Sequence, residues 1–192
     1  MILDVPYIPQ ESIEKGERKD WCALACLAMV LGYHLGDKAP TLEEIHQKYA
    51  PELESKENFI SVGIKHKDIL RIAREYNLRG FRKSWHVLPG AQPILDRFKE
   101  EGESVKDITS WEQTNIEESS YTLESMVNKQ IPVILSVSKE FSTSSNTHLV
   151  VLVGVEGDDF LIHDPYQKGA NYRISKEEFK KYWLKQAVFI QN

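Results

Sequence analysis

Cysteine is scarce in this sequence: its 192 residues contain two, Cys22 and Cys26. Four positions apart on one predicted helix, the two thiols fit a mutual disulfide poorly. No second cysteine pair is present to complete a four-thiolate metal site. We therefore expect reduced thiols, no metal and no cofactor. A metal site made of both cysteines and one histidine is the weaker alternative.

Long apolar runs and an excess of basic residues are also missing. No apolar run reaches the roughly 18 residues that a membrane-spanning helix requires. A net charge of −5 argues against nucleic acid or an anionic membrane as the main partner. The first residues, Met1–Pro6, lack the basic and long apolar stretches of a signal peptide. These absences predict a cytoplasmic chain without a membrane span, unless a signal has been trimmed.

What is present is the composition of an ordinary globular protein, with 41% apolar and 28% charged residues. No low-complexity segment divides the chain, and its length is sufficient for one hydrophobic core. We therefore expect a single domain over residues 1–192. The sequence leaves the oligomeric state open.

The most apolar helical segment begins near Asp20, which can serve as its N-cap, and Gly32 or Gly36 can end it. Cys22 falls on the first turn of this helix. Unpaired backbone N–H groups and the positive end of the helix dipole favour a thiolate there. Cys26 lies one turn further along and is expected to be a small core residue.

The rest of the chain divides into two parts. Helical patterns fall at residues 41–49, where Thr41 and Glu44 form a capping box, and at 67–76, 93–100 and 121–130. Strand patterns fall at residues 131–137, 148–155, 159–163, 171–174 and 187–190, with a last helix from the Ser175 cap through Trp183. Helices followed by antiparallel strands indicate the α+β class, with a helical half at about 1–130 and a sheet half at about 131–192. This arrangement places an active site in the cleft between the halves.

A thiol enzyme needs a histidine that takes and returns the proton, and a group that orients the imidazole. His148 is the best candidate for the base, because it directly precedes the apolar run 149–153. A polar ring at the start of a buried strand either hydrogen-bonds to a partner or has a function. The histidines that have charged neighbours are expected at the surface: His34, His46, His66 and His86.

Asp164 is the candidate for the orienting group. It ends a predicted strand before Pro165, on the same face as the apolar side chains two and four positions earlier. Pairing across a hairpin turn at Gly157-Asp158 would bring Asp164 opposite His148, within reach of its Nδ1. His163 would then point away, which makes it the second choice for the base. The alternative is that Asp164 merely ends a strand.

An acyl-transfer site also needs hydrogen-bond donors for the negative charge that forms on the carbonyl oxygen. The backbone N–H of Cys22 is one natural donor. Gln10, at the end of the extended N-terminal segment, is a candidate for the second. The alternative for Gln10 is an amide that faces solvent.

Six blocks of sequence carry a resemblance to a known family. In chain order they are Val5-Pro6-Tyr7-Ile8-Pro9-Gln10, Trp21-Cys22, Ala25–Leu31, Thr147–Val151, Ile162–Pro165 and Ser175–Phe179. Together they resemble the bacteriocin-processing cysteine peptidases and their free-standing relatives, a papain-like family of which some members cleave leader peptides after paired glycines. The resemblance does not extend over roughly residues 65–120.

The resemblance implies a papain-like α+β fold in which the helix of the nucleophile packs on the C-terminal antiparallel sheet. It assigns Cys22 as nucleophile, His148 as base, Asp164 as orienting group and Gln10 as oxyanion donor. The chain departs from the family at Ala23-Leu24, where the family usually has Gly, often followed by Pro. A methyl group at this point is expected to narrow the approach to the thiol.

The expected function is thiol-dependent hydrolysis of a peptide or amide bond, through an acyl-enzyme, in a peptide or protein substrate. Two alternatives remain open. One is a catalytically weak peptide-binding module of the same fold, and the other is an acyl or peptidyl transferase. Because every position of the Cys-His-Asp triad is filled, the enzyme is favoured over the binding module.

Overall fold

The computed structural model describes residues 1–13, 21–55, 64–84, 123–142 and 147–192. The expected Asp20 cap, the expected helix at 93–100 and the surface position of His86 lie outside these residues. None of the described helices is long and apolar enough to cross a membrane.

Three helices make up most of the helical half: α1 (Cys22–Leu35), α2 (Leu42–Glu54) and α4 (His66–Glu75). Helix α1 is central, because its residues 23–31 are all small or apolar and all buried. The capping box of α2 is confirmed: the Glu44 N–H donates to Thr41 Oγ1 at 3.2 Å, and the Thr41 N–H donates to Glu44 Oε2 at 2.8 Å. Helix α2 runs beyond residue 49, where the predicted helix ends, and includes Pro51.

The sheet half is built on six antiparallel strands in the order β1-β6-β2-β3-β4-β5. The strands are β1 (Arg79–Ser84), β2 (Val133–Ser138), β3 (Thr147–Glu156), β4 (Asp159–Asp164), β5 (Gly169–Ser175) and β6 (Trp183–Gln191). Shorter elements are the 3-10 turns η1 (Gln10–Ile13), η2 (Gly36–Lys38) and η4 (Lys139–Phe141), the helix α8 (Lys176–Tyr182) and a helical turn at 123–128. Five of the strands and the Ser175 cap of α8 agree with the sequence-based prediction, whereas β1 was not predicted.

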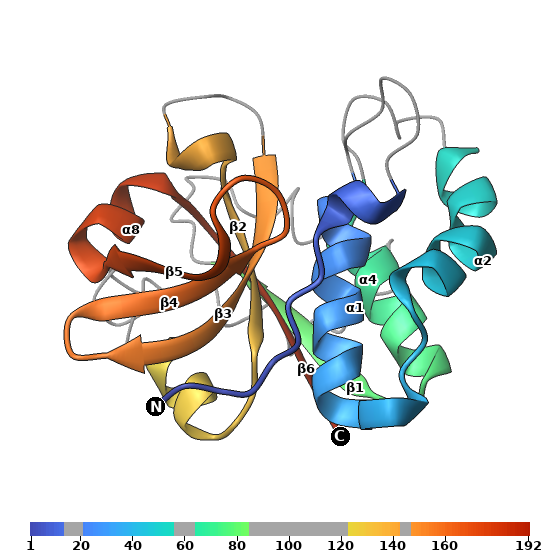
Figure 1. The fold of residues 1–192 in the computed structure, drawn as a ribbon, viewed down its shortest axis with the longest axis horizontal. Helices are drawn as coiled ribbons and strands as arrows, with labels where there is room; N and C mark the ends of the chain where they lie inside the picture. Colours follow the sequence, from blue (N-terminus) through green and yellow to red (C-terminus); the bar gives the residue numbers. More distant parts are fainter. Residues whose placement is uncertain (14–20, 56–63, 85–122, 143–146) are drawn as a thin grey trace, which may run out of the picture.

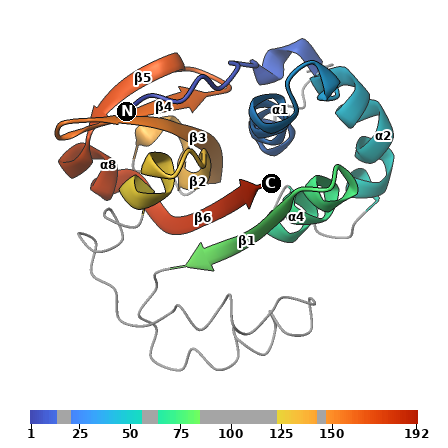
Figure 2. The same cartoon turned by 90° about the horizontal axis from the view of Figure 1, so that it is seen from below.

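Helices from both halves of the chain pack on the sheet. Helix α8 covers β4, where Phe179 meets Phe160 edge-on with 5.1 Å between ring centroids. Helix α4 packs on β1, so closely that a Cβ on Gly80 would lie 2.8 Å from Leu70 Cδ2. Strands β6 and β1 extend beneath the helices (Figure 2). The N-terminal segment runs from the sheet to the top of α1 (Figure 1), and it carries Gln10 to the same end of the molecule as Cys22.

The β3–β4 hairpin turns at Gly157-Asp158 as predicted, with Gly157 at a φ of 57°. Its register differs from the prediction. The turn closes on the pair Glu156↔Asp159, and a bulge between Leu152 and Gly154 shifts the pairing again. The pairing Val151↔His163, continued by one residue, places Asp164 opposite position 150. Asp164 is therefore a diagonal neighbour of His148 and not its direct partner.

Candidate active site

Cys22 is the first residue of α1. Trp21 is the N-cap, since its carbonyl accepts the first helical hydrogen bond from the Ala25 N–H at 3.1 Å, and its side chain supplies no cap. The N–H groups of the first turn therefore have no acceptor within the helix. The Cys22 thiol at this turn is partly exposed.

Cys26 lies one turn deeper and is completely buried. Burial raises the pKa of the Cys26 thiol well above its usual value, and the nearby Cys22 and Asp164 raise it further. These surroundings keep Cys26 a neutral thiol. Its position agrees with the predicted core role.

His148 and Asp164 form a buried pair, with 2.7 Å between His148 Nε2 and Asp164 Oδ1. The sequence-based expectation named Nδ1, so the nitrogen is corrected. The Cys22 side chain is close enough to the His148 ring to raise the pKa of the imidazole. Since Asp164 occupies Nε2, Nδ1 is the nitrogen left for the thiol.

The carboxylate of Asp164 is held by the turn that follows β4. The Tyr166 N–H donates to Oδ1 at 2.9 Å and the Lys168 N–H donates to Oδ2 at 3.2 Å. Burial alone would raise the pKa of Asp164, but the hydrogen bond and charge of His148, together with these two N–H groups, lower it. Asp164 is thereby fixed as an anion that accepts from the imidazole.

Burial alone would lower the pKa of His148. Its hydrogen bond to Asp164 and the proximity of Cys22 outweigh burial and raise the pKa to about 9. The imidazole is therefore held in its protonated form at neutral pH. The Tyr166 ring stands beside it, with 6.4 Å between the ring centroids, and the Lys139 ammonium lies 5.4 Å from the centroid of Tyr166.

His163, the second choice for the base, is bound elsewhere. Its Nε2 lies 3.0 Å from the Val5 carbonyl oxygen, and its Nδ1 accepts from the Asn171 N–H at 3.1 Å. Both ring nitrogens are thus used by the backbone. This placement agrees with the prediction that His163 points away from the thiol.

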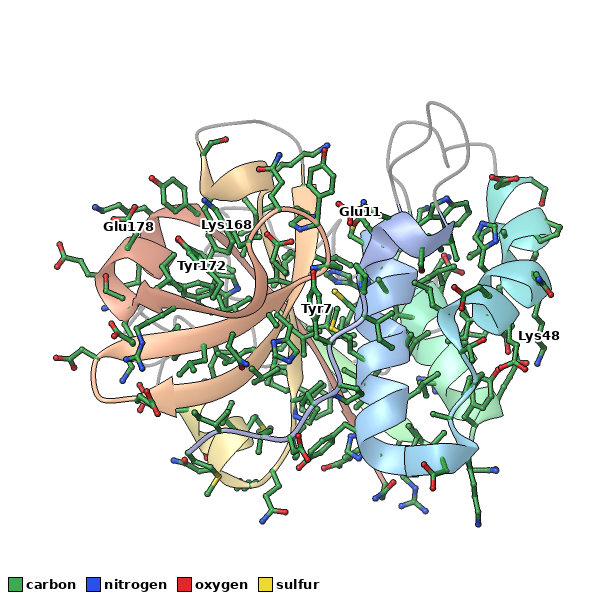
Figure 3. The ribbon with its side chains drawn as sticks, viewed as in Figure 1. Tyr7, Glu11, Lys48, Lys168, Tyr172 and Glu178 are labelled. Carbon is green, nitrogen blue, oxygen red and sulfur yellow. The ribbon has the colours of Figure 1, made fainter. Side chains whose placement is uncertain are left out.

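Gln10 is 2% exposed, so it is not the solvent-facing amide of the alternative interpretation. Its N–H donates to the carbonyl oxygen of Pro165 at 2.9 Å, directly after Asp164. Nearby, the Tyr7 hydroxyl donates to the Asp164 carbonyl oxygen at 3.1 Å, and Figure 3 shows Tyr7 on the segment between the sheet and α1. Neither Tyr7 nor Tyr166 was predicted as a site residue. Their positions in the sequence could have indicated them, because Tyr7 lies within the block 5–10 and Tyr166 directly follows Asp164-Pro165.

Ala23 is 2% exposed, and its methyl group belongs to the hydrophobic core. The expected narrowing of the approach to the thiol stays a prediction, and the methyl group itself packs against protein. Among the described residues, no group of three or more His, Cys, Asp or Glu side chains is placed to hold a metal ion.

Comparisons with known proteins agree on one family. A family model described as "Peptidase_C39 like family" matches residues 2–187. No curated protein sequence matches the chain.

Three solved structures share the fold. A protein from Bacillus anthracis described as a C39-like peptidase is 18% identical, with a TM-score of 0.62 over 100% of this chain and 96% of that one. The peptidase domain of Streptococcus ComA, a bifunctional ABC transporter of a quorum-sensing pathway, is 17% identical, with a TM-score of 0.57 over 96% of each chain. A double glycine motif protease from an AMS/PCAT transporter, solved with its leader peptide, is 20% identical, with a TM-score of 0.51 over 98% of this chain and 92% of that one.

The family model covers nearly the whole chain, and the TM-scores of 0.62 and 0.57 show that the fold is shared with the solved peptidase structures. The chain belongs to the Peptidase C39-like family and has its papain-like α+β fold.

Proposed function

We propose that the protein is a thiol-dependent peptide hydrolase that works through an acyl-enzyme, with Cys22 as nucleophile, His148 as proton carrier and Asp164 as orienting group. The observation that carries the proposal is the position of His148. One side of its ring hydrogen-bonds to a buried carboxylate and the other is left for a partly exposed thiol at a helix N-terminus. A histidine between these two groups is the arrangement that nucleophilic catalysis requires.

The reaction follows from these positions. The Cys22 thiolate attacks the carbonyl carbon of a peptide bond, and the imidazolium of His148 gives its proton to the leaving amine as the C–N bond breaks. The thioester that remains is attacked by water, whose proton passes to His148. Collapse of this second intermediate breaks the C–S bond, which releases the acid and restores the thiolate–imidazolium pair. Asp164 stays ionised throughout and keeps Nε2 as its donor.

Each attack places negative charge on the former carbonyl oxygen. We assign the Cys22 N–H and the Gln10 side-chain amide as the donors that stabilise it. Three facts support Gln10: it is buried, it begins η1, and its backbone is bonded to the residue after Asp164. The first-turn N–H of Cys22 has no acceptor within α1.

The proposal is tested by cleavage of peptides that contain paired glycines, chosen because one solved neighbour is a double glycine motif protease. Mass spectrometry should find new termini with the wild-type protein, and after acid quenching a thioester on Cys22. Cys22→Ala should abolish both. Cys26→Ala is the matched control, because it removes the same atom one turn deeper and should retain cleavage.

Equal cleavage by Cys22→Ala and the wild type would contradict the assigned nucleophile. Peptides that bind to the wild-type protein without being cut would instead identify a binding module of this fold.

A further inference from the structure

The N-terminal segment is bonded to the sheet along its length. At its start, the Leu3 N–H donates to the Val153 carbonyl at 2.7 Å and the Val155 N–H donates to the Met1 carbonyl at 2.9 Å. These bonds lie at the bulge of β3, far along the strand from His148. The first three residues are thus fixed to the sheet independently of the site.

Residues 5–10 form the second part of this segment and follow the end of β4. Three of them bond in turn to three consecutive residues: Val5 to His163, Tyr7 to Asp164, and Gln10 to Pro165. Tyr7 and Gln10 donate two of these bonds, and the acceptors are backbone carbonyls at the last residue of β4 and at the residue after it. The bond at Val5 is made by a side chain, and that side chain is the titratable ring of His163.

The contacts of His163 determine which ring nitrogen carries the proton. Its Nδ1 accepts from the Asn171 N–H, so the proton lies on Nε2, which donates to the Val5 carbonyl. The ring is 3% exposed, and burial lowers its pKa, which keeps it neutral. Tyr7 packs edge-on against it, with 5.6 Å between centroids. The ring therefore joins three backbone regions: β4, β5 and the N-terminal segment.

We propose that His163 is a positioning residue that sets the place of Gln10. By holding the buried Val5 carbonyl, its imidazole fixes one end of residues 5–10, so that Gln10 stands in register with Asp164 and Pro165. The inference rests on the proposed function, because it takes Gln10 as the oxyanion donor.

A displacement at Val5 is transmitted to Gln10 because the intervening backbone has little freedom. Pro6 and Pro9 each fix φ near −65° and make no N–H available for new bonds. Pro6 is also confined on its other side by α1, since a Cβ on Gly32 would lie only 2.6 Å from Pro6 Cγ. We therefore expect a displacement at Val5 to move Gln10 away from the end of β4.

The test is kinetic and uses three substitutions. His163→Phe keeps a planar ring but removes both hydrogen bonds, and it should lower kcat by about 10- to 100-fold while KM changes less than about twofold. His163→Gln keeps a donor and an acceptor and should recover part of the loss. His34→Phe is the matched control, because His34 also bonds a backbone carbonyl, that of Ile190 at 2.9 Å, which lies on β6 and not in residues 5–10. It should leave kcat unchanged.

The decisive measurement repeats His163→Phe in a Gln10→Ala background. A residue that acts through Gln10 loses its effect there, so the double variant should be no slower than Gln10→Ala alone. If the two losses multiply, or if His34→Phe slows turnover as much as His163→Phe, the effect is one of general stability and the proposal is wrong.

A spectroscopic measurement separates this inference from the proposed function. In ¹⁵N-labelled protein, the His163 ring should carry its proton on Nε2, and His163→Phe should shift the backbone amide signals of Tyr7 and Gln10. Unshifted amides would overturn the positioning role. Unchanged kinetics in Gln10→Ala, with shifted amides, would instead overturn the oxyanion role that Gln10 has in the proposed function.

Discussion

The two thiols of this protein lie one helical turn apart in opposite surroundings. Cys22 is partly exposed at the N-terminus of α1, whereas Cys26 is completely buried and its pKa is raised by burial. Iodoacetamide should therefore alkylate Cys22 almost exclusively in the folded protein, as peptide mass spectrometry after limited labelling can show. Cys22→Ala should remain unlabelled over the same period. Preferential labelling of Cys26 would contradict the assignment.

Gln10 gives a prediction on the rate of the reaction. If its amide stabilises the oxyanion, Gln10→Ala should lower kcat/KM by roughly 10²–10³-fold. Gln10→Glu should be at least as slow, because it places a carboxylate where negative charge must form. Both are measured on any peptide that the wild-type protein cleaves. Unchanged kinetics in both variants would show that Gln10 is only a buried loop amide.

The His148–Asp164 pair predicts a dependence of stability on alkaline pH. The pKa of His148 is raised to about 9 in the folded state, above its ordinary value of 6.5. Its stabilising contribution is therefore complete below pH 6.5 and is lost as the pH rises through 9. Urea unfolding from pH 6.5 to 9.5 should show a decline of up to about 3 kcal/mol. Asp164→Asn should be less stable at pH 6.5 and show a shallower decline; an equally steep one would contradict the pairing.

The residues of this pair could be predicted from the sequence, whereas the geometry of their contact could not. The residue types and their place at strand ends identify His148 and Asp164 from the sequence. The contact of Asp164 with Nε2 rather than Nδ1 was not predicted, and neither was the bulge in β3, which no local pattern reveals. His34 and His66 were placed at the surface because of charged neighbours. Instead they bond to Ile190 and Ser136, which lie 156 and 70 positions away along the chain.

At the scale of elements, four of the five strands that the sequence predicts contain long buried runs, and the fifth, β5, is largely exposed. Strand β1 was missed because its sequence, Arg79-Gly80-Phe81-Arg82-Lys83-Ser84, carries three basic residues and one large apolar one. Among the described strands it lies at the edge of the sheet and pairs with β6 alone, and Phe81 stacks on Phe189 with 4.8 Å between ring centroids. Such a strand depends on its partner, so tertiary contacts override its weak propensity.

Helix α1 and the N-terminal segment meet at one point that a substitution can probe. Gly32 lies inside α1, where alanine is favoured by roughly 0.5–1 kcal/mol. The Cβ of an alanine at this position would nevertheless lie 2.6 Å from Pro6 Cγ, and the proline ring cannot rotate away. Overpacking of this kind costs about 1–3 kcal/mol, so Gly32→Ala should lower the free energy of unfolding. Pro6→Ala removes the opposing atom, and the double variant should be more stable than Gly32→Ala. A single Gly32→Ala variant as stable as the wild type would contradict the close approach.

At the scale of the whole molecule, the helical and sheet halves are joined by few polar bonds among the described residues. One of them is made by His66, the first residue of α4, whose Nε2 lies 2.9 Å from Ser136 Oγ on β2. Ser136 is 1% exposed, so the bond lies inside the interface between the halves. Burial, together with the charge of Arg82 on β1, lowers the pKa of His66 to about 4.

This lowered pKa makes the interface sensitive to acid. Between pH 6.5 and 4 the unfolded chain binds a proton at His66 that the folded protein excludes, so stability falls as the pH falls through this window, by up to about 3 kcal/mol. His66→Gln cannot take up that proton but can still bond to Ser136. Its free energy of unfolding, measured in urea at several pH values, should therefore fall less between pH 6.5 and 4 than that of the wild type, while the two differ by a constant amount above pH 7. Curves that stay parallel down to pH 4 would show that His66 is not excluded from protonation, and that acid does not act on this interface.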